Sequence, residues 1–179
     1  IISDGWSMDI LIKELLLLYN AYIQGEENSL TPLRIQYKDY TAWQQDALSG
    51  EVLKDHQTYW LNQLEGELPV LELLGDKIRP AVKTYNGGAI NRRINSDLSR
   101  GLKTLCKEEG ATLYMGLLAV VNTLLHQYTN QEDIIIGSPI AGREHIDLTD
   151  QIGFYVNTLA LRTRFKGEDT YRKLLENIK

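Results

Sequence analysis

The segment Asp133–Ile140 (DIIIGSPI) decides the fold class, because it places a strand in a chain whose other patterns are mainly helical. Its isoleucines at 134–136 form an uninterrupted β-branched run bounded by glycine and proline, which predicts a strand covered on both faces. Downstream, apolar and polar residues alternate in Phe154–Phe165, which predicts a half-exposed strand. Upstream, Ala89–Ile94 is short and strand-like. The chain is therefore expected to contain sheet as well as helix.

Around these strands, apolar residues recur at spacings of three and four, which is typical of one face of a helix. The helical segments are Ser7–Tyr22, Tyr37–Ala47, Glu51–Leu64, Asp97–Glu109, Thr112–Gln127 and Glu168–Lys179. Ser7 is expected to cap the first helix, with Gly25 beyond its end, and Thr112 to begin the fifth. The fifth helix is apolar over a broad face and is expected to be a central core helix. Helices and strands are mixed throughout, so the class is α/β or α+β.

Two of these helices have a face that the spacing predicts to be apolar and packed. In the first helix this face contains Met8, Leu11, Ile12, Leu15, Leu18, Tyr19 and Tyr22. In the third helix the residues expected to be buried are Val52, Tyr59, Trp60 and Leu64.

Composition excludes several classes of protein. The chain has 179 residues, with 19 Lys and Arg against 24 Asp and Glu and a formal net charge of −5. This acidic balance argues against nucleic-acid binding, which needs a basic patch to displace phosphate counterions. A single cysteine excludes an intramolecular disulfide framework and a cysteine-based zinc site. No apolar run approaches the roughly 20 residues of a membrane span, so no membrane partner and a cytoplasmic setting are expected.

The three histidines are the first candidates for acid–base chemistry. None has a spacing typical of a metal site, so no metal is expected. His56 and His126 lie on predicted helices, where a structural role is favoured over a catalytic one. His145 lies in a polar loop, and both roles stay open there. Cys106 is expected to be a small buried residue. These residues alone do not name a reaction.

Four blocks, in order along the chain, carry a family resemblance. Ile1–Ser7 (IISDGWS) resembles the end of a His-His-x-x-x-Asp-Gly motif, and Tyr37–Trp43 (YKDYTAW) resembles a Tyr-x-Asp-Tyr-x-x-Trp element. Ile152–Thr158 (IGFYVNT) resembles an Ile-Gly-x-Phe-Val-Asn-Thr element, and Gly137–Arg143 (GSPIAGR) is similar to the stretch that precedes it. Together they resemble the condensation domains of nonribosomal peptide synthetases.

The resemblance implies a mixed α/β fold like that of chloramphenicol acetyltransferase, a two-layer sandwich whose two lobes flank a tunnel. Residues 1–65 would be the end of the first lobe, 66–88 the connection between lobes, and 89–179 the first part of the second lobe. The sequence begins at Ile1 rather than Met, which indicates an internal fragment. A fragment of this kind is expected to expose an uncovered apolar face and to be poorly soluble alone.

The family's activity implies roles for the first motif. Condensation domains form amide bonds between carrier-bound aminoacyl or peptidyl thioesters, and the second motif histidine positions or deprotonates the attacking amine. That histidine would precede Ile1, so Asp4 and Gly5 are the remnant of the catalytic motif. Asp4 is expected to pair with an arginine, for which Arg143 is the candidate, or else only to cap the helix that follows. Gly5 would permit a tight turn and close backbone approach, and its amide could stabilise an oxyanion.

Two roles are open for each of the other motif residues. Asn157 and Thr158 are expected to line the substrate tunnel, or else to make ordinary hydrogen bonds at a strand edge. Trp6, Tyr40 and Trp43 are more consistent with core residues than with contact residues.

The resemblance also implies partners. These are the upstream and downstream peptidyl carrier domains, which bear the phosphopantetheine, and an adjacent adenylation domain; the chain itself is expected to bind no cofactor. The 179 residues alone are expected to be inactive. Three alternatives remain: an epimerization domain, a heterocyclization domain, and a non-catalytic domain of the same fold that only docks a carrier or other partner.

Overall fold

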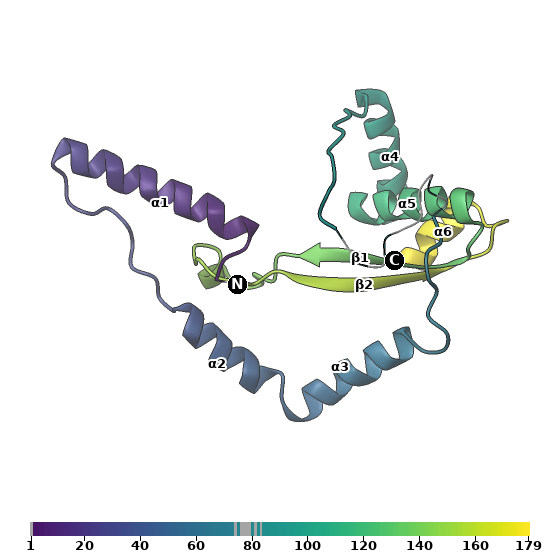
Figure 1. Cartoon of the computed structure of the whole chain (residues 1–179), viewed down its shortest axis with the longest axis horizontal. Helices are drawn as coiled ribbons and strands as arrows, with labels where there is room; N and C mark the ends of the chain where they lie inside the picture. The colour runs from purple at the N-terminus through teal and green to yellow at the C-terminus, as the bar shows by residue number, and fades with distance from the viewer. Residues whose placement is uncertain (1, 74, 76–79, 81, 83) are drawn as a thin grey trace. The chain divides into compact units, whose positions relative to one another are not determined.

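The computed structural model describes residues 2–73, 75, 80, 82 and 84–179 of the chain (Figure 1). The chain forms two compact units. The first unit contains Ile1–Glu65 and Gly137–Ala160, and the second contains Gly66–Ile136 and Leu161–Lys179. Both units therefore combine segments that are far apart in the sequence.

The helices agree with the segments that the spacing predicts. The first unit contains α1 (Gly5–Gln24), α2 (Tyr37–Ala47), α3 (Gly50–Gln63) and a short 3-10 helix, η1 (Ile146–Leu148). The second unit contains α4 (Ser96–Glu108), α5 (Leu113–Thr129) and α6 (Tyr171–Ile178). The strands are β1 (Asp133–Ile140) and β2 (Asn157–Arg164), which pair in a two-stranded sheet. A mixed α/β class is confirmed.

Helix α1 begins earlier than predicted. Its N-cap is Asp4, whose carboxylate accepts a hydrogen bond from the amide of Ser7, and Ser7 is the third helical residue rather than the cap. The Asp4 amide in turn donates to the Ser7 hydroxyl oxygen, which completes a capping box. The helix ends at Gly25, which has a φ of 69° and lies in the left-handed region that favours glycine.

Helix α6 begins later than predicted, at Tyr171 instead of Glu168. Thr170 caps it by accepting a hydrogen bond from the Lys173 amide. The residues before it form a separate turn, in which the Asp169 carboxylate accepts from the Lys166 amide.

The core of the first unit is small and aromatic. Tyr40, Leu148 and Tyr155 are buried together, with Ile35 packed against them. The expectation of a core position is confirmed for Tyr40 but wrong for the two tryptophans, since Trp6 is 48% exposed and Trp43 is 62% exposed.

The predicted apolar faces of α1 and α3 are not buried. Every residue of the α1 face is exposed, and the buried residues of that helix are Ser7, Ile10 and Ala21. Helix α3 has no buried residue, and its Val52 and Tyr59 are exposed. Helical periodicity shows which residues share a face, but burial also needs a second element against that face.

The second unit packs α5 against α4 and α6. Its core contains Ala119, Leu174 and Leu175, with partly buried apolar side chains around them: Ala111, Met115, Phe165, Tyr171 and Ile178. Figure 1 shows α6 beside α5. Cys106 of α4 is 2% exposed, as expected.

Helix α5 contributes small residues to this core rather than its large ones. Gly116, Ala119 and Asn122 are buried, whereas most of the predicted apolar face is exposed: Leu113, Leu117, Val120, Val121 and Leu124. A Cβ at Gly116 would overlap the sulfur of Cys106, so α4 approaches α5 where a side chain is missing. The prediction of a central core helix is therefore right for one face only.

The strand predictions need three corrections. Ala89–Ile94 forms no strand, because no described strand lies beside it to complete its backbone hydrogen bonds. In β1, Ile134 is buried but its two isoleucine neighbours are only partly covered. Strand β2 begins at Asn157 rather than Phe154, since the Phe154 carbonyl and the Tyr155 amide bond to side chains instead.

The predicted connection at residues 66–88 lies partly outside the described residues, at 74, 76–79, 81 and 83. Its described part forms neither helix nor strand. Among the helices of the described ranges, none is both long and apolar enough to cross a membrane.

Candidate functional site

A buried ion pair joins the start of α1 to the loop that follows β1. A guanidinium nitrogen of Arg143, Nη2, lies 3.2 Å from Oδ1 of Asp4, and the two side chains are 1% and 3% exposed. The residues are 139 positions apart in the sequence. Asp4 thus has both of the roles that the sequence left as alternatives, since it pairs with Arg143 and also caps α1.

The environment of Asp4 favours its charged form. Burial by itself would raise its pKa, but hydrogen bonds from the Ser7 hydroxyl, the Ser7 amide, the Tyr155 amide and Arg143 more than offset this. The pKa of Asp4 is consequently lowered to about 2. The carboxylate is therefore charged at neutral pH.

Ser7 connects three parts of the site through one oxygen. Its Oγ lies 2.7 Å from Asp4 Oδ1 and 2.8 Å from the Gly153 carbonyl oxygen, and it accepts from the Gly153 amide at 3.1 Å. Nη2 of Arg143 also donates to it, at 3.1 Å. A residue that the pattern predicts only as a helix cap therefore fixes the IGFYVNT segment against the helix start.

Arg143 is enclosed on its other sides. Its Nη1 donates to the carbonyl oxygens of Leu148 and Gln151, the latter at 2.7 Å. Its guanidinium carbon lies 4.1 Å from the ring centroid of Tyr155 and 5.8 Å from that of Trp6, which are cation–π distances. The guanidinium therefore has one orientation, set by hydrogen bonds at its edge and aromatic rings at its faces.

Two glycines of the motifs allow this close packing. Gly142 has a φ of 66°, and a Cβ there would overlap the carbonyl oxygen of Tyr155. A Cβ at Gly153 would overlap the ring of Tyr37, whose hydroxyl donates to the Phe154 carbonyl at 2.9 Å. Each glycine is thus required by a neighbouring backbone or ring atom.

The other predicted site residues lie beside this cluster but outside its hydrogen bonds. Asn157 and Thr158 are exposed at the start of β2, where the Asn157 side chain accepts from the Thr158 amide at 2.8 Å. Tyr155, whose amide donates to Asp4 at 3.2 Å, lies two residues before Asn157. At Gly5, no described atom lies within 4 Å of the position of a Cβ, so contacts within the described chain do not require glycine there.

The histidines do not join the cluster. His56 is exposed on α3, and His126 lies 2.9 Å from the Gln131 carbonyl oxygen through its Nδ1. His145 caps η1 by accepting from the Asp147 amide. Within the described ranges, no group of three or more His, Cys, Asp or Glu side chains is placed to hold a metal ion.

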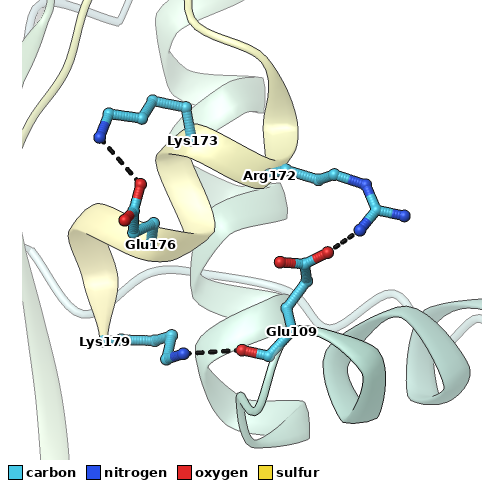
Figure 2. Close-up of a pocket in the computed structure, with 5 residues that line it drawn as sticks. All are labelled: Glu109, Arg172, Lys173, Glu176 and Lys179. Atoms are coloured by element: carbon cyan, nitrogen blue, oxygen red, sulfur yellow. Dashed lines mark hydrogen bonds and ion pairs between the residues drawn. The ribbon is translucent and has the colours of Figure 1, made fainter.

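A separate pocket in the second unit is lined by charged residues: Glu109, Arg172, Lys173, Glu176 and Lys179 (Figure 2). Arg172 forms an ion pair with Glu109, and Lys179 donates to the Glu109 carbonyl at 2.7 Å. Lys173 pairs with Glu176 at 2.8 Å. None of these residues belongs to one of the four motif blocks, so the Asp4 cluster is the candidate functional site.

Gln151 is the member of the cluster that the sequence pattern does not single out. It is 1% exposed and its side chain bonds to Tyr155, Ile35 and Asp147. Its position directly before the IGFYVNT motif was the available signal, but a glutamine in a loop has no periodicity that predicts burial.

Comparison with known proteins shows the family to which this chain belongs. The family model of the condensation domain matches residues 1–179. The chain belongs to the condensation-domain family. A linear gramicidin synthase protein of Brevibacillus parabrevis is 46% identical over 179 residues, which is 100% of this chain and 4% of that protein. Malpinin synthetase of Mortierella alpina is 42% identical over 179 residues, which is 100% of this chain and 2% of that protein.

Solved condensation domains have the same fold. The X-domain from teicoplanin biosynthesis is 27% identical with a TM-score of 0.88, and the match covers 99% of this chain and 40% of that one. The first condensation domain of the calcium-dependent antibiotic synthetase is 19% identical with a TM-score of 0.71, over 99% and 39% of the two chains. The fold expected from the four motifs, that of the chloramphenicol acetyltransferase-like condensation domains, is confirmed. This chain spans part of such a domain's length.

Proposed function

We propose that this chain is part of an enzyme that forms amide bonds between carrier-bound aminoacyl or peptidyl thioesters. The observation that carries the proposal is the Asp4–Arg143 pair, which ties the Asp-Gly motif to the segment that leads into Asn157. A fixed, fully hydrogen-bonded carboxylate suits a residue that holds a catalytic loop rather than one that transfers protons.

In this proposal, the amine of the acceptor attacks the donor thioester carbonyl, the amide C–N bond forms, and the C–S bond breaks to release the phosphopantetheine thiol. The motif histidine that precedes the Asp-Gly pair in this family positions or deprotonates the amine, and the thiolate receives a proton on leaving. Asp4, Ser7 and Arg143 hold the backbone that carries this histidine. The amide of Gly5, at the N-terminus of α1, donates to the developing oxyanion.

Asn157 and Thr158 are proposed to line the tunnel for the phosphopantetheine arms. Their exposure at the start of β2 supports this role, because a tunnel residue must be open to a substrate. The partners are upstream and downstream carrier domains and an adenylation domain, in a cytoplasmic synthetase. Residues 1–65 and 89–179 are proposed to belong to the first and second lobes, with 66–88 between them.

The test is amide formation by the full-length protein with both carrier domains loaded, followed by mass spectrometry of the carrier-bound product. Asp4→Asn keeps the shape of the side chain but removes its charge, and we expect about a hundredfold loss of the rate. Asp97→Asn is the matched control, because Asp97 is an exposed aspartate paired with Arg100 on α4. Wild-type product and a selective loss in Asp4→Asn support the proposal, and equal rates in the two variants contradict it.

Two other functions give different results in the same assay. An epimerization domain would invert the α-carbon of one loaded residue, and solvent deuterium would then enter that position without amide formation. A docking domain would bind its partner and give neither product. The docking alternative has a specific basis, because the X-domain from teicoplanin biosynthesis, which is similar to this chain, has been solved in complex with OxyB.

The proposal includes one statement about the 179 residues tested by themselves. They contain no His-His pair before Asp4, so we expect no amide product from them. Product formed by these residues between two loaded carrier domains would contradict this.

A further inference from the structure

The loop between β1 and β2 contains a buried side-chain amide, that of Gln151, which bonds to three residues around the Asp4–Arg143 site. Gln151 Oε1 accepts from the Tyr155 hydroxyl at 2.5 Å, and Nε2 donates to the carbonyl oxygens of Ile35 and Asp147 at 2.8 and 3.0 Å. Both donors and the acceptor of the side chain are therefore used. A side chain fixed on three sides has one orientation and can fix its partners in turn.

Two of the groups that hold Arg143 are the Gln151 backbone and one of these partners, Tyr155. The Gln151 carbonyl oxygen accepts from Nη1 of Arg143 at 2.7 Å. The Tyr155 ring, held at its hydroxyl end by Gln151, lies 4.1 Å from the guanidinium carbon. The other end of the same residue, its amide, donates to Asp4. Gln151 is thus connected to Asp4 by two short routes, one through Arg143 and one through Tyr155.

The third contact adds a distant segment. Through the Ile35 carbonyl, Gln151 fixes the residue that comes directly before the cap of α2, whose Tyr37 and Tyr40 pack against the Tyr155 ring. Helix α2 carries the YKDYTAW motif. Gln151 therefore bonds to two motif blocks, to Tyr155 through its side chain and to Arg143 through its carbonyl oxygen, and to the segment that leads into a third.

We propose that Gln151 is a positioning residue for acyl transfer, which orients Arg143 and Tyr155 and through them the Asp-Gly turn before α1. The proposal rests on the proposed function for the reaction it serves. It assigns Gln151 no contact with substrate. Loss of its amide is expected to lower kcat, because the turn moves relative to the reacting atoms, while the binding surfaces for the loaded carriers remain.

The test compares Gln151→Met with Asn122→Leu in the full-length protein. Asn122 is the matched control, since it is also a buried side-chain amide, lies in the second unit, and donates to the Leu118 carbonyl. We expect Gln151→Met to lower kcat at least about tenfold with KM for the loaded carriers changed by less than about twofold, because small displacements near the chemistry are costly. Asn122→Leu should leave both constants unchanged. An unchanged kcat in Gln151→Met, or a rise in KM alone, overturns the proposal.

A double variant separates positioning from general loosening. In an Arg143→Lys background, Gln151→Met should lower kcat by a smaller factor than it does in the wild type, because the route through the Tyr155 ring and Arg143 is already broken and only the route through the Tyr155 amide remains. Effects that multiply would overturn the proposal. Tyr155→Phe keeps the ring over Arg143 and removes only the hydroxyl that Gln151 accepts from, so it tests the link even if Gln151→Met folds poorly. A kcat equal to that of the wild type in Tyr155→Phe counts against the link.

A second readout does not depend on turnover and so distinguishes this proposal from the proposed function. The amides of Gly153 and Tyr155 bond to Ser7 and Asp4, and their hydrogen exchange can be followed by mass spectrometry in the full-length protein. We expect their exchange to accelerate at least about tenfold in Gln151→Met and not in Asn122→Leu. If the wild type forms no amide, the proposed function fails while this readout still supports or overturns the positioning role. Unchanged exchange overturns it.

Discussion

Each unit of this chain contains an arginine–aspartate pair, and the two pairs differ in how completely they are enclosed. In the first unit, Arg143 and Asp4 are both almost fully buried. In the second unit, Arg162 is 3% exposed but its partner Asp133 is 32% exposed, and Nη2 lies 2.6 Å from Oδ2. Asp133 also accepts from Arg164, at 3.4 Å. The Arg143–Asp4 pair is buried among loop residues, whereas the Arg162–Asp133 pair joins two strands and is partly exposed to solvent.

The difference shows what burial adds to an ion pair. Hydrogen bonds and charge from Arg162 lower the pKa of Asp133, with burial acting in the opposite direction. For Asp4, burial is the largest single influence and opposes ionisation, and several hydrogen bonds are needed to reverse it. A buried pair adds little net stability as long as it is complete, but removal of one partner leaves an uncompensated charge. The enclosed pair should therefore be the more sensitive one.

The largest expected effect is that of Arg143→Met, which leaves Asp4 buried without its partner. We expect a loss of about 3–5 kcal/mol in the free energy of unfolding. Arg162→Met should cost less, because water can reach Asp133 and Arg164 remains beside it. Urea unfolding of the full-length protein checks both variants, with Arg100→Met, at an exposed position on α4, as the control. Equal losses in the free energy of unfolding at the two sites would show that burial of the aspartate does not set the sensitivity of the pair.

The next effect concerns the backbone that carries the enclosed arginine. Gly142→Ala requires a φ of 66° and places a Cβ against the Tyr155 carbonyl oxygen, so we expect a loss of at least about 2 kcal/mol. Gly137→Ala in the same motif is the control, since its nearest contact is Thr158 at an ordinary 3.4 Å. That variant should change stability by less than about 1 kcal/mol. Thermal unfolding of the two variants tests this, and similar melting temperatures would contradict it.

A pH series sharpens the comparison without a large structural change. The pKa of Asp4 in the folded chain is about 2, below the ordinary value near 3.9, so its charged form stabilises the fold. That stability is fully present above about pH 4 and is lost as the pH falls toward 2, and it amounts to about 2–3 kcal/mol. Unfolding free energies at pH 6, 4, 3 and 2 should show a steeper decline for the wild type than for Asp4→Asn. Parallel curves would rule out this role.

The smallest expected effect is the loss of a helix cap alone, which can be compared with the loss of a cap together with an ion pair. Thr112 caps α5 in the second unit with a capping box like that of Asp4, but it is exposed and makes no ion pair. Thr112→Ala should therefore cost only about 1 kcal/mol, which is typical of a lost cap. Asp4→Ala removes a cap and a buried ion pair together and should cost clearly more. Helix-terminal hydrogen exchange and urea unfolding measure the difference, and equal costs would mean that the Asp4 carboxylate acts as a cap alone.

The local sequence pattern predicted the positions of the helices and strands well, but it predicted poorly which of their residues are buried. Six helices and two strands lie where spacing and alternation place them, since those signals depend on neighbouring residues. Apart from the strand predicted at Ala89–Ile94 and the shifted ends of some elements, the errors concern burial. The apolar faces of α1 and α3 are exposed, while the polar residues Ser7, Gln151 and Asn122 are among the most buried. Arg162, on the strand that alternation predicts to be half-exposed, has a buried side chain because Asp133 accepts from it.

The sequence by itself determined the family, through four motif blocks whose order and residue types are local facts of the chain. It also pointed to Asp4 and Arg143 as partners, because a buried carboxylate needs a cation. Only the tertiary structure decided that these residues, 139 positions apart, meet with Ser7, Tyr155 and Gln151 around them. The physical reason is that hydrogen bonds and ion pairs act over a few ångströms of space, and a sequence specifies spacing along the chain only.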